Sequence, residues 1–291
     1  MEIPRAVRAI SPEELRKFMA EHEEGAYTLV DVRQPQEYRQ EHLPGAQLIP
    51  VSELETRLGE LPAEQDLVFY CKSGARSAAA ALIAQDSGVI RGSIMHLHGG
   101  ILAWEGGSIG SLPRVEVFAG VRSASELLMK ALELEKAAHT MYTMVRASSQ
   151  RTALCNLMDK LIGVEEAHAR MVYRYLSRYW TDDSGELPPF EVLFDTLQGR
   201  VLEGGLTVDE LEPWIRGAIQ GECVELADLA LEVELNAYDL YRTLARQAAA
   251  SNGAFGLGAD AELIFLDLAS QEKHHARLIM SRMAAFEEPK A

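Results

Sequence analysis

The segment EEAHAR at residues 165–170 places a carboxylate and an imidazole three positions apart. Positions i and i+3 share one face of a helix, so Glu165 and His168 could bind the same metal ion. The spacing is also compatible with an ordinary solvated helix face, because one E-x-x-H match is expected about once by chance in a chain of this length. The motif alone leaves both interpretations open.

A second copy of the motif favours the metal interpretation. The segment EKHHAR at residues 272–277 aligns Glu272 with Glu165 and His275 with His168, and the same Ala-Arg pair follows in both segments. The sequence contains no other E-x-x-H match. Two matched carboxylate–imidazole motifs are much less expected from unrelated helix faces than one is.

Two further segments repeat in the same way. LELEKAAHTMY at residues 132–142 matches LEVELNAYDLY at residues 231–241, which aligns Glu135 with Glu234. The order Glu, E-x-x-H, Glu, E-x-x-H is the ligand set of a carboxylate-bridged dinuclear metal site in a four-helix bundle. The predicted metal ligands are Glu135, Glu165, His168, Glu234, Glu272 and His275.

These residue types suit two divalent cations. Glutamates can bridge two hard cations, each histidine supplies one neutral nitrogen, and four carboxylates balance two divalent ions. Without metal, the carboxylates would face apolar neighbours at a cost of several kcal/mol for each buried ion. The aligned Tyr142 and Tyr241 could form hydrogen bonds near the site, but core packing is the favoured interpretation. Glu166 is interpreted as an outward-facing bystander.

A second candidate site lies in the N-terminal part, where Cys71 follows the apolar run LVFY and precedes KSGARS and a helical stretch. The carboxyl end of such a strand is the usual ligand position in an open α/β sheet. Backbone N–H groups from Lys72 to Arg76 can converge on the sulfur, and the helix start adds positive potential. Both effects lower the thiol pKa and make Cys71 nucleophilic, and the alternative is a buried, inert cysteine.

The elements around this cysteine alternate between short apolar runs and helical patterns. Strands separated by helices indicate a parallel sheet with flanking helices. Strands are predicted at residues 7–10, 27–32, 46–50, 67–71 and 94–97, and helical stretches near 12–22, 52–60 and 76–86.

The composition changes after Trp104. Residues 105–120 are rich in Gly, Ser and Pro, and the chain beyond them has heptad-like apolar spacing with few breakers. The pattern predicts an α/β domain over residues 1–107, a linker over 108–122 and an all-α four-helix bundle over 123–288. Long helices are predicted at about 123–148, 151–179, 213–250 and 259–286, and residues 181–212 carry the chain along the bundle.

The bulk composition limits the partners. The 291 residues carry a formal net charge of −16, so phosphate backbones and anionic lipid surfaces would repel the protein. The sequence has no apolar signal segment and no run near the ~18 apolar residues of a membrane span. Three scattered cysteines form no C-x-x-C pair. We therefore expect a cytoplasmic protein that binds neither nucleic acid nor membranes.

Residues 1–107 resemble a rhodanese domain. The motifs that carry the resemblance are LVDVR (29–33), Glu37-Tyr38, HLPGA (42–46), IP (49–50), CKSGARS (71–77) and GGILAW (99–104). The resemblance implies that Cys71 accepts a sulfane sulfur from thiosulfate or a persulfide and passes it to a thiol or cyanide. It also implies that Arg76 closes the loop. The implied substrate-binding residues are Lys72, Ser73, Gly74, Ala75, Arg76 and Ser77, together with Asp31 and Arg33 as structural or rim residues of the site.

The length of the cysteine loop bears on the substrate. Four residues separate Cys71 from Arg76, whereas related phosphatase-like domains have five. The shorter loop suits a sulfur atom or thiosulfate better than a phosphate ester. Phosphatase activity is thus a weak alternative, and a catalytically silent sensing domain is another.

Residues 120–286 resemble the rubrerythrin branch of the ferritin-like superfamily, on the ligand order described above. The resemblance implies a cofactor of two iron ions, with Mn or Zn as possible substitutes, and by analogy a homodimer. Two features depart from that family. The chain has no paired cysteines for a rubredoxin-like module, and Ala237 stands where the family carries an additional glutamate.

These observations lead to two hypotheses. The first is a bifunctional enzyme, in which Cys71 transfers sulfur and a diiron centre reduces peroxide or oxygen with electrons from an unknown donor. The second is an iron-binding or sensing bundle joined to a persulfide carrier that serves a partner protein. Peroxide turnover by the iron-loaded protein distinguishes the two.

Overall fold

The computed structural model describes residues 7–110, 112–180, 185–218, 223–250 and 260–283. The chain divides into two compact units, Met1–Leu112 and Pro113–Ala291. The division falls inside the expected linker, and the expected end of the bundle at residue 288 lies outside the described residues. Within the described part of the chain, no helix combines the length and the apolar character needed to cross a membrane.

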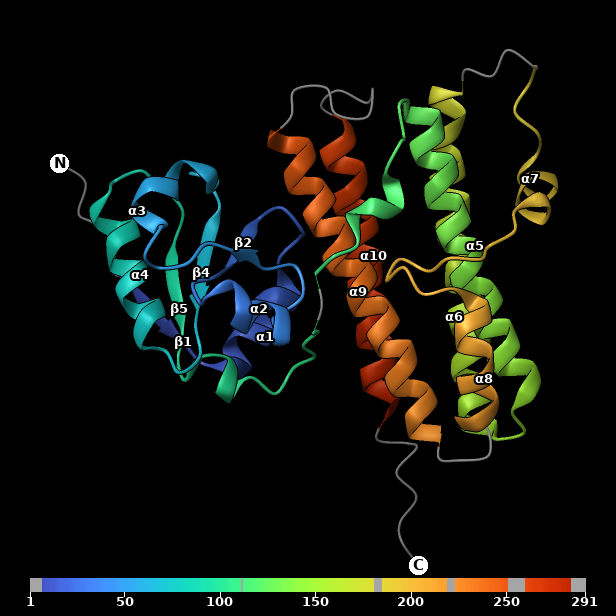
Figure 1. Ribbon diagram of the computed structural model, residues 1–291, viewed down its shortest axis with the longest axis horizontal. Coiled ribbons are helices and arrows are strands. Elements are labelled where there is room, and N and C mark those ends of the chain that lie inside the picture. The colour runs from blue at the N-terminus through green and yellow to red at the C-terminus, as the bar shows by residue number, and fades with distance from the viewer. Residues whose placement is uncertain (1–6, 111, 181–184, 219–222, 251–259, 284–291) are drawn as a thin grey trace, which may run out of the picture. The chain divides into compact units, whose positions relative to one another are not determined.

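The first unit is built on a five-stranded sheet in which every strand pair is parallel (Figure 1). Its strands are β1 (Arg8–Ile10), β2 (Tyr27–Asp31), β3 (Gln47–Leu48), β4 (Asp66–Tyr70) and β5 (Ile94–Leu97). Their order across the sheet is β1-β5-β4-β2-β3, which places β4 at the centre. The predicted parallel α/β sheet is confirmed, and each predicted strand position contains a strand.

Helices pack on both faces of this sheet. Leu29 and Val68 point to the face covered by α1 (Pro12–Glu21) and α2 (Pro35–Gln40). The alternate residues Val30 and Phe69 point to the face covered by α3 (Leu54–Arg57) and α4 (Ala75–Asp86). Because successive strand residues face opposite sides, buried strands of this kind are apolar throughout.

Two helical segments of this unit differ from the prediction. The helix α2 lies outside the expected helical stretches, because its six residues are too few for a periodic pattern. It begins with Pro35 and is held by a capping box between Gln34 and Glu37. The expected stretch 52–60 is shorter than predicted and consists of α3 followed by the 3₁₀ turn η1 (Leu58–Glu60).

The second unit is dominated by four long helices (Figure 1). Along the chain these are α5 (Ala124–Ser148), α6 (Thr152–Tyr179), α9 (Cys223–Ala250) and α10 (Asp260–Met283). The helices α5 and α6 pack along each other, as do α9 and α10. The helix α5 begins where Ser123 Oγ accepts a hydrogen bond from Glu126 N at 3.2 Å, as the sequence pattern predicts. The largely helical C-terminal region is therefore confirmed.

The third predicted helix, 213–250, is wrong in its first part. The structure has a separate helix α8 (Val208–Ala218), with Pro213 inside it, before α9 begins. The helix α8 starts early because Thr207 and Glu210 cap it reciprocally, with Glu210 Oε2 2.8 Å from Thr207 N. The expected crossover 181–212 also contains a short helix, α7 (Phe190–Thr196).

Between α7 and α8 the chain folds back on itself over residues 200–208, which we call the crossover hairpin. Val208 N donates to Arg200 O and Leu202 N donates to Leu206 O, both at 2.9 Å. Leu202 is buried among apolar residues of the bundle. The hairpin is thus part of the packed interior of the second unit.

The bundle core consists of two apolar layers stacked along the helices. On α5, Leu134 belongs to one layer and Ala137 to the other, with Glu135 between them. The change of layer occurs at Glu234 on α9 and near Glu272 on α10. The predicted ligands therefore form a polar layer inside an otherwise apolar core.

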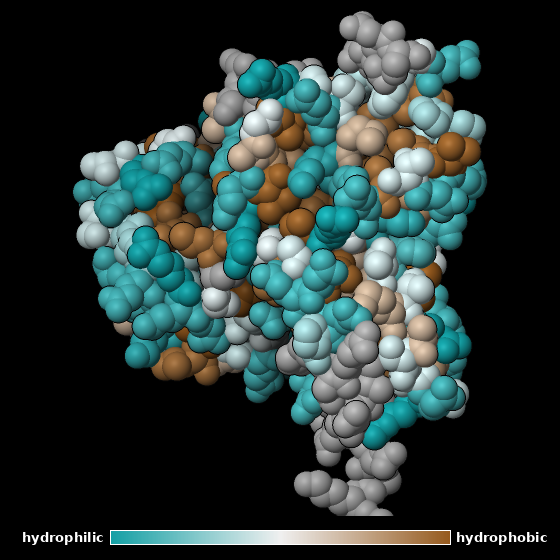
Figure 2. Space-filling model, turned by 45° about the vertical axis from the view of Figure 1, so that its right-hand side comes forward, coloured by the Kyte–Doolittle hydropathy of each residue, from teal (hydrophilic) through white to brown (hydrophobic). Residues whose placement is uncertain are grey.

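Hydrophilic residues cover most of the face shown in Figure 2, and apolar residues there form interrupted patches. The whole sequence has 44 acidic against 28 basic residues.

Candidate functional sites

Cys71 directly follows β4 at the carboxyl end of this central strand, and its loop leads into α4. Its side chain is buried, and Gly74 N donates a hydrogen bond to Sγ at 3.1 Å. Gly74 has a φ of +101°, a left-handed conformation that favours glycine, and it caps the start of α4. The loop therefore surrounds the sulfur with donors.

The electrostatics of the loop favour a thiolate. Burial raises the pKa of Cys71, but hydrogen bonds from the Ser77 hydroxyl and from the backbone N–H groups of Ser77, Gly74 and Ser73 outweigh burial and lower it below the usual value. The Ser77 hydroxyl also lies 3.0 Å from Gly74 O, so it can rotate between this carbonyl and the sulfur. A lowered pKa makes Cys71 a nucleophile near neutral pH.

The outer side of the cysteine loop is exposed to solvent, and its backbone is supported by a neighbouring turn. Lys72, Ser73 and Ala75 are exposed, which leaves the outer side of the loop open to solvent. The GGILAW motif forms the 3₁₀ turn η2 (Gly100–Ala103) and braces the loop, because Ile101 N donates to Cys71 O at 2.8 Å. The motif that carries part of the resemblance thus supports the cysteine loop through this backbone hydrogen bond.

Arg76 is half-buried and pairs with Glu37 of α2. Its two terminal nitrogens donate to the two carboxylate oxygens at 2.8 Å each. This bidentate hydrogen bond lowers the pKa of Glu37 to about 2. Sequence reasoning cited Glu37 only as part of a motif, and the pair shows that it holds Arg76 beside the cysteine loop.

Asp31 and Arg33 form a buried ion pair at the end of β2. Arg33 Nη2 lies 2.6 Å from Asp31 Oδ2 and also donates to Glu41 O at 2.6 Å. Both side chains are almost fully buried. Their charges compensate each other, and the arginine also donates to a backbone carbonyl. The structure places these two residues as a support for the sheet edge rather than as groups open to a substrate.

The six predicted metal ligands lie together in the polar layer of the bundle. Each is at most 6 % exposed, and burial of four carboxyl groups and two imidazoles in one layer is unusual and requires compensation. Three overlapping groups have one donor atom per residue, all within 4.8 Å of one another. These groups are Glu165 with His168 and His275, Glu135 with His168 and Glu272, and Glu234 with Glu272 and His275.

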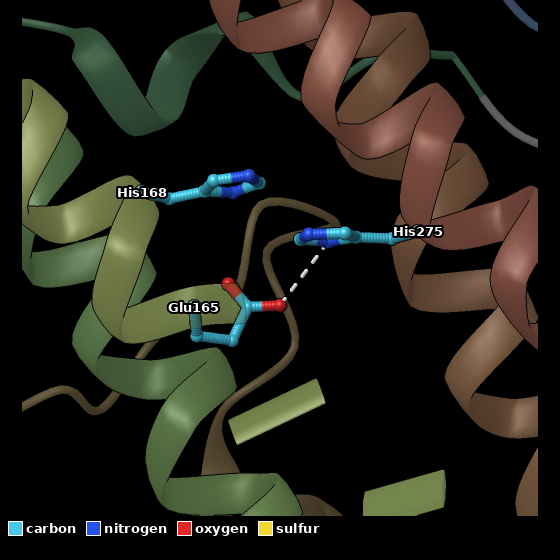
Figure 3. A group of neighbouring side chains, drawn as sticks. All are labelled: Glu165, His168 and His275. Atoms are coloured by element: carbon cyan, nitrogen blue, oxygen red, sulfur yellow. Dashed lines mark ion pairs between the residues drawn. The ribbon is translucent and has the colours of Figure 1, made fainter. Parts of the chain in front are cut away.

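His275 is the hub of this centre. Its Nδ1 lies 3.0 Å from Glu234 Oε2, 3.2 Å from Glu165 Oε1 and 3.3 Å from Glu272 Oε2. Its ring stacks on that of His168, with centroids 4.3 Å apart (Figure 3). Figure 3 shows Glu165 and the two imidazoles pointing into the same space from facing helices. Residues from both helix pairs thus converge on a single site.

The protonation of this centre responds to its burial and its negative charge. Burial raises the pKa of Glu135 and Glu272 well above the usual value, and neighbouring carboxylates raise it further. Burial alone would lower the pKa of His275, but the charges of Glu234 and Glu165 outweigh it and raise the pKa. Burial lowers the pKa of His168 to about 2, so this imidazole is neutral.

Several polar atoms of the centre have no hydrogen-bond partner among the described residues. They are both carboxylate oxygens of Glu135, Nδ1 of His168 and Nε2 of His275. Buried polar atoms are nearly always paired, so unpaired carboxylate and imidazole atoms in one cluster suit a bound cation. The donor set of carboxylate oxygens and imidazole nitrogens fits two divalent transition-metal ions.

Tyr142 also belongs to this site. Its hydroxyl donates a hydrogen bond to Glu234 Oε1, so it orients a predicted ligand rather than only filling the core. The favoured interpretation as core packing is therefore incomplete for Tyr142, although the side chain is fully buried. The aligned Tyr241 is buried too, and its hydroxyl has no partner among the described residues.

Glu203, which sequence reasoning missed, is buried at the tip of the crossover hairpin. Burial raises its pKa to about 8, and repulsion from Glu165 and Glu234 adds to this rise. The only sequence signal was a single acid within the otherwise apolar or glycine run VLEGGL. Solvent-exposed loop acids are common, so that signal identifies nothing without the structure.

The parallel sheet with a cysteine cradle at its carboxyl edge defines the class of the first unit. Residues 11–106 match the Rhodanese-like domain family. A sulfurtransferase of Allochromatium vinosum is 38% identical over 98 residues, which are 34% of this chain and 88% of that protein. The chain therefore belongs to the rhodanese-like family, through its N-terminal domain.

A second relative and one solved structure are also similar to this chain. The probable adenylyltransferase/sulfurtransferase MoeZ of Mycobacterium tuberculosis is 41% identical over 97 residues, which are 33% of this chain but only 24% of that protein. A crystal structure of a rhodanese-related protein from Thermoplasma volcanium is 28% identical, covers 36% of this chain and 99% of that chain, and has a TM-score of 0.32.

Proposed function

We propose that the first unit is a sulfurtransferase with Cys71 as its nucleophile. The supporting observation is the sulfur that is held by loop N–H groups in a domain of the rhodanese-like family. In the first step the Cys71 thiolate attacks the outer sulfur of thiosulfate, and sulfite leaves with the bonding pair. In the second step cyanide or a thiolate attacks the terminal sulfur of the persulfide, which restores the Cys71 thiolate.

The chain's own groups account for both steps. The donors that stabilise the thiolate of Cys71 can also stabilise the anionic persulfide, because its terminal sulfur carries the same charge. The exposed Lys72 adds positive charge at the outer side of the loop, where an anionic donor must approach. Glu37 holds Arg76 at the rim, so this guanidinium is positioned before any substrate binds.

The pH dependence of alkylation tests the thiolate. We expect the rate for Cys71 to reach half its maximum below pH ~8.5, the value of an ordinary thiol, because a lowered pKa preserves thiolate at lower pH. Ser77→Ala removes the hydroxyl donor and should move the midpoint upward, which slows alkylation at pH 7. The measurement is iodoacetamide labelling of the Cys71 peptide, quantified by mass spectrometry.

Ser73→Ala is the matched control, because Ser73 is an exposed serine of the same loop that contributes its backbone N–H. That variant should keep the wild-type midpoint. Equal midpoints for Ser77→Ala and the wild type would show that the hydroxyl of Ser77 does not act on the sulfur.

We further propose that the second unit is a ferritin-like bundle with a dinuclear metal centre. The observation that supports it is the buried layer of four glutamates and two histidines with unpaired oxygen and nitrogen atoms. A pair of iron ions held there would supply redox chemistry toward peroxide or oxygen. The protein's part is to fix the ligands, to orient Glu234 through Tyr142 and to exclude bulk water.

Metal analysis of anaerobically purified protein tests this centre. We expect two iron ions per chain and an absorbance change when peroxide is added, with repeated turnover once a reductant is present. Zinc alone, or no metal, would contradict a redox role. Binding of two iron ions without turnover would favour the second hypothesis, in which the bundle holds or senses iron and Cys71 carries sulfur for a partner protein.

A further inference from the structure

The crossover hairpin brings an additional acid into the bundle interior. Glu203 is 3% exposed, and its Oε2 has no hydrogen-bond partner among the described residues. Burial of a carboxylate oxygen without a partner is unfavourable, so natural proteins pair such an atom or let it bind a cation. The hairpin therefore carries an acid that this structure leaves unexplained.

The residue before the hairpin lies against α5, and the tip of the hairpin lies against α9. On one side, a Cβ on Gly199 would come 2.7 Å from the carbonyl carbon of Lys136, the residue after the α5 ligand. On the other side, a Cβ on Gly204 would lie 3.4 Å from Cβ of Asn236, two residues after the α9 ligand. Both contacts lie at the level of the polar layer, so the hairpin enters the bundle at the height of the metal centre.

The charges that act on Glu203 identify its neighbours. Its carboxylate is repelled by those of Glu165 and Glu234 and attracted by His275. It also acts on Glu135 and on the Tyr241 hydroxyl. Glu203 therefore lies within electrostatic range of predicted ligands on all four long helices.

We propose that Glu203 is a seventh metal ligand, which the crossover hairpin supplies to one ion of the dinuclear centre. This inference rests on the proposed metal centre. Carboxylate oxygen is a suitable ligand for hard divalent cations. A bound cation would compensate the negative charge of the buried Glu203 carboxylate. The loop can reach the core because Gly199, directly before the hairpin, permits a close approach of the chain to α5.

Metal titration of the full-length apoprotein tests the proposal. Chelator-treated wild type and Glu203→Gln are titrated anaerobically with Co²⁺, and bound ions are counted while the visible spectrum is recorded. We expect two ions in the wild type. In Glu203→Gln one of the two should bind about tenfold more weakly or worse, with an altered Co²⁺ spectrum, because that ion loses a carboxylate.

Two further variants sharpen the result. Glu203→Asp keeps the charge but shortens the side chain by one methylene, so its affinity should fall between those of the wild type and Glu203→Gln. Glu232→Gln makes the same charge change at an exposed position of α9 and should behave as the wild type. Melting curves of the apoproteins establish that each variant is folded.

Wild-type affinity together with an unchanged spectrum in Glu203→Gln would overturn the ligand role. If Glu203→Gln does not fold, Glu203→Asp decides, and wild-type affinity in that variant is the contradicting result. Failure of the wild-type protein itself to bind two ions would instead refute the metal centre, so the two failures are distinguishable.

Discussion

Cys71→Ser should reduce thiosulfate:cyanide sulfurtransferase activity by about a thousandfold or more, to the background rate. The reason is that an alcohol beside the same loop donors cannot form the persulfide, since a serine hydroxyl stays protonated at neutral pH. The loop should keep its shape, because serine differs from cysteine by one atom. The rate of thiocyanate formation is the measurement.

Cys155→Ser is the matched control for this substitution. Cys155 is also a buried free thiol, but it lies in the bundle on α6, where its Sγ lies 3.3 Å from Ser149 O. This variant should retain full activity. Undiminished transfer in Cys71→Ser would refute the nucleophile assignment, and loss of activity in Cys155→Ser would show that the bundle takes part in the transfer.

The metal content of the same variant tests whether the two sites are independent. Cys71→Ser leaves every predicted metal ligand in place, so the variant should bind metal as the wild type does. Each unit has its own apolar core, so we expect the two sites to be independent. Loss of metal in Cys71→Ser would show that they depend on each other.

The strand positions of the first unit could be predicted because both faces of its sheet are covered. Burial on both faces makes each strand an uninterrupted apolar run, as in Leu67–Tyr70 of β4. The short helix α2 could not be found, because a six-residue helix shows no hydrophobic period. The role of Arg76 in an ion pair with Glu37 depends on a contact across 39 positions, which one sequence does not reveal.

The polar layer of the second unit could be predicted from an internal repeat. Helix geometry places Glu165 and His168 on one face, and the aligned Glu272 and His275 repeat that face on α10. Glu203 has no counterpart in the repeat, and its position depends on the path of a hairpin between two helices. Such a path is fixed by tertiary packing and not by a local pattern.

Removal of metal should destabilise the wild-type bundle, and Glu135→Gln should weaken that dependence. In the apoprotein, Glu135 is fully buried and neither of its carboxylate oxygens has a hydrogen-bond partner among the described residues. Glutamine has the same shape without the charge, and its amide can donate to neighbouring carboxylates. We therefore expect the apo variant to have a free energy of unfolding about 1–3 kcal/mol higher than the apo wild type.

The metal-loaded proteins should show the opposite order. Two bound ions stabilise the wild type by about 2.7 kcal/mol for each site at a hundredfold excess over its dissociation constant. Glu135→Gln loses a charged ligand, binds the ions more weakly and gains less of this stabilisation. Differential scanning calorimetry of the full chain, with and without chelator, measures the metal-sensitive transition of each protein.

Glu166→Gln is the control, because Glu166 is next to a predicted ligand but forms an exposed ion pair with Arg170. Exposed pairs of this kind contribute little to stability, so its melting should follow the wild type with and without metal. The expected result is that the difference in unfolding free energy between Glu135→Gln and the wild type changes sign between the apo and metal-loaded forms. If Glu135→Gln is less stable than the wild type in both forms, Glu135 stabilises the fold directly and its burial does not serve to bind a cation.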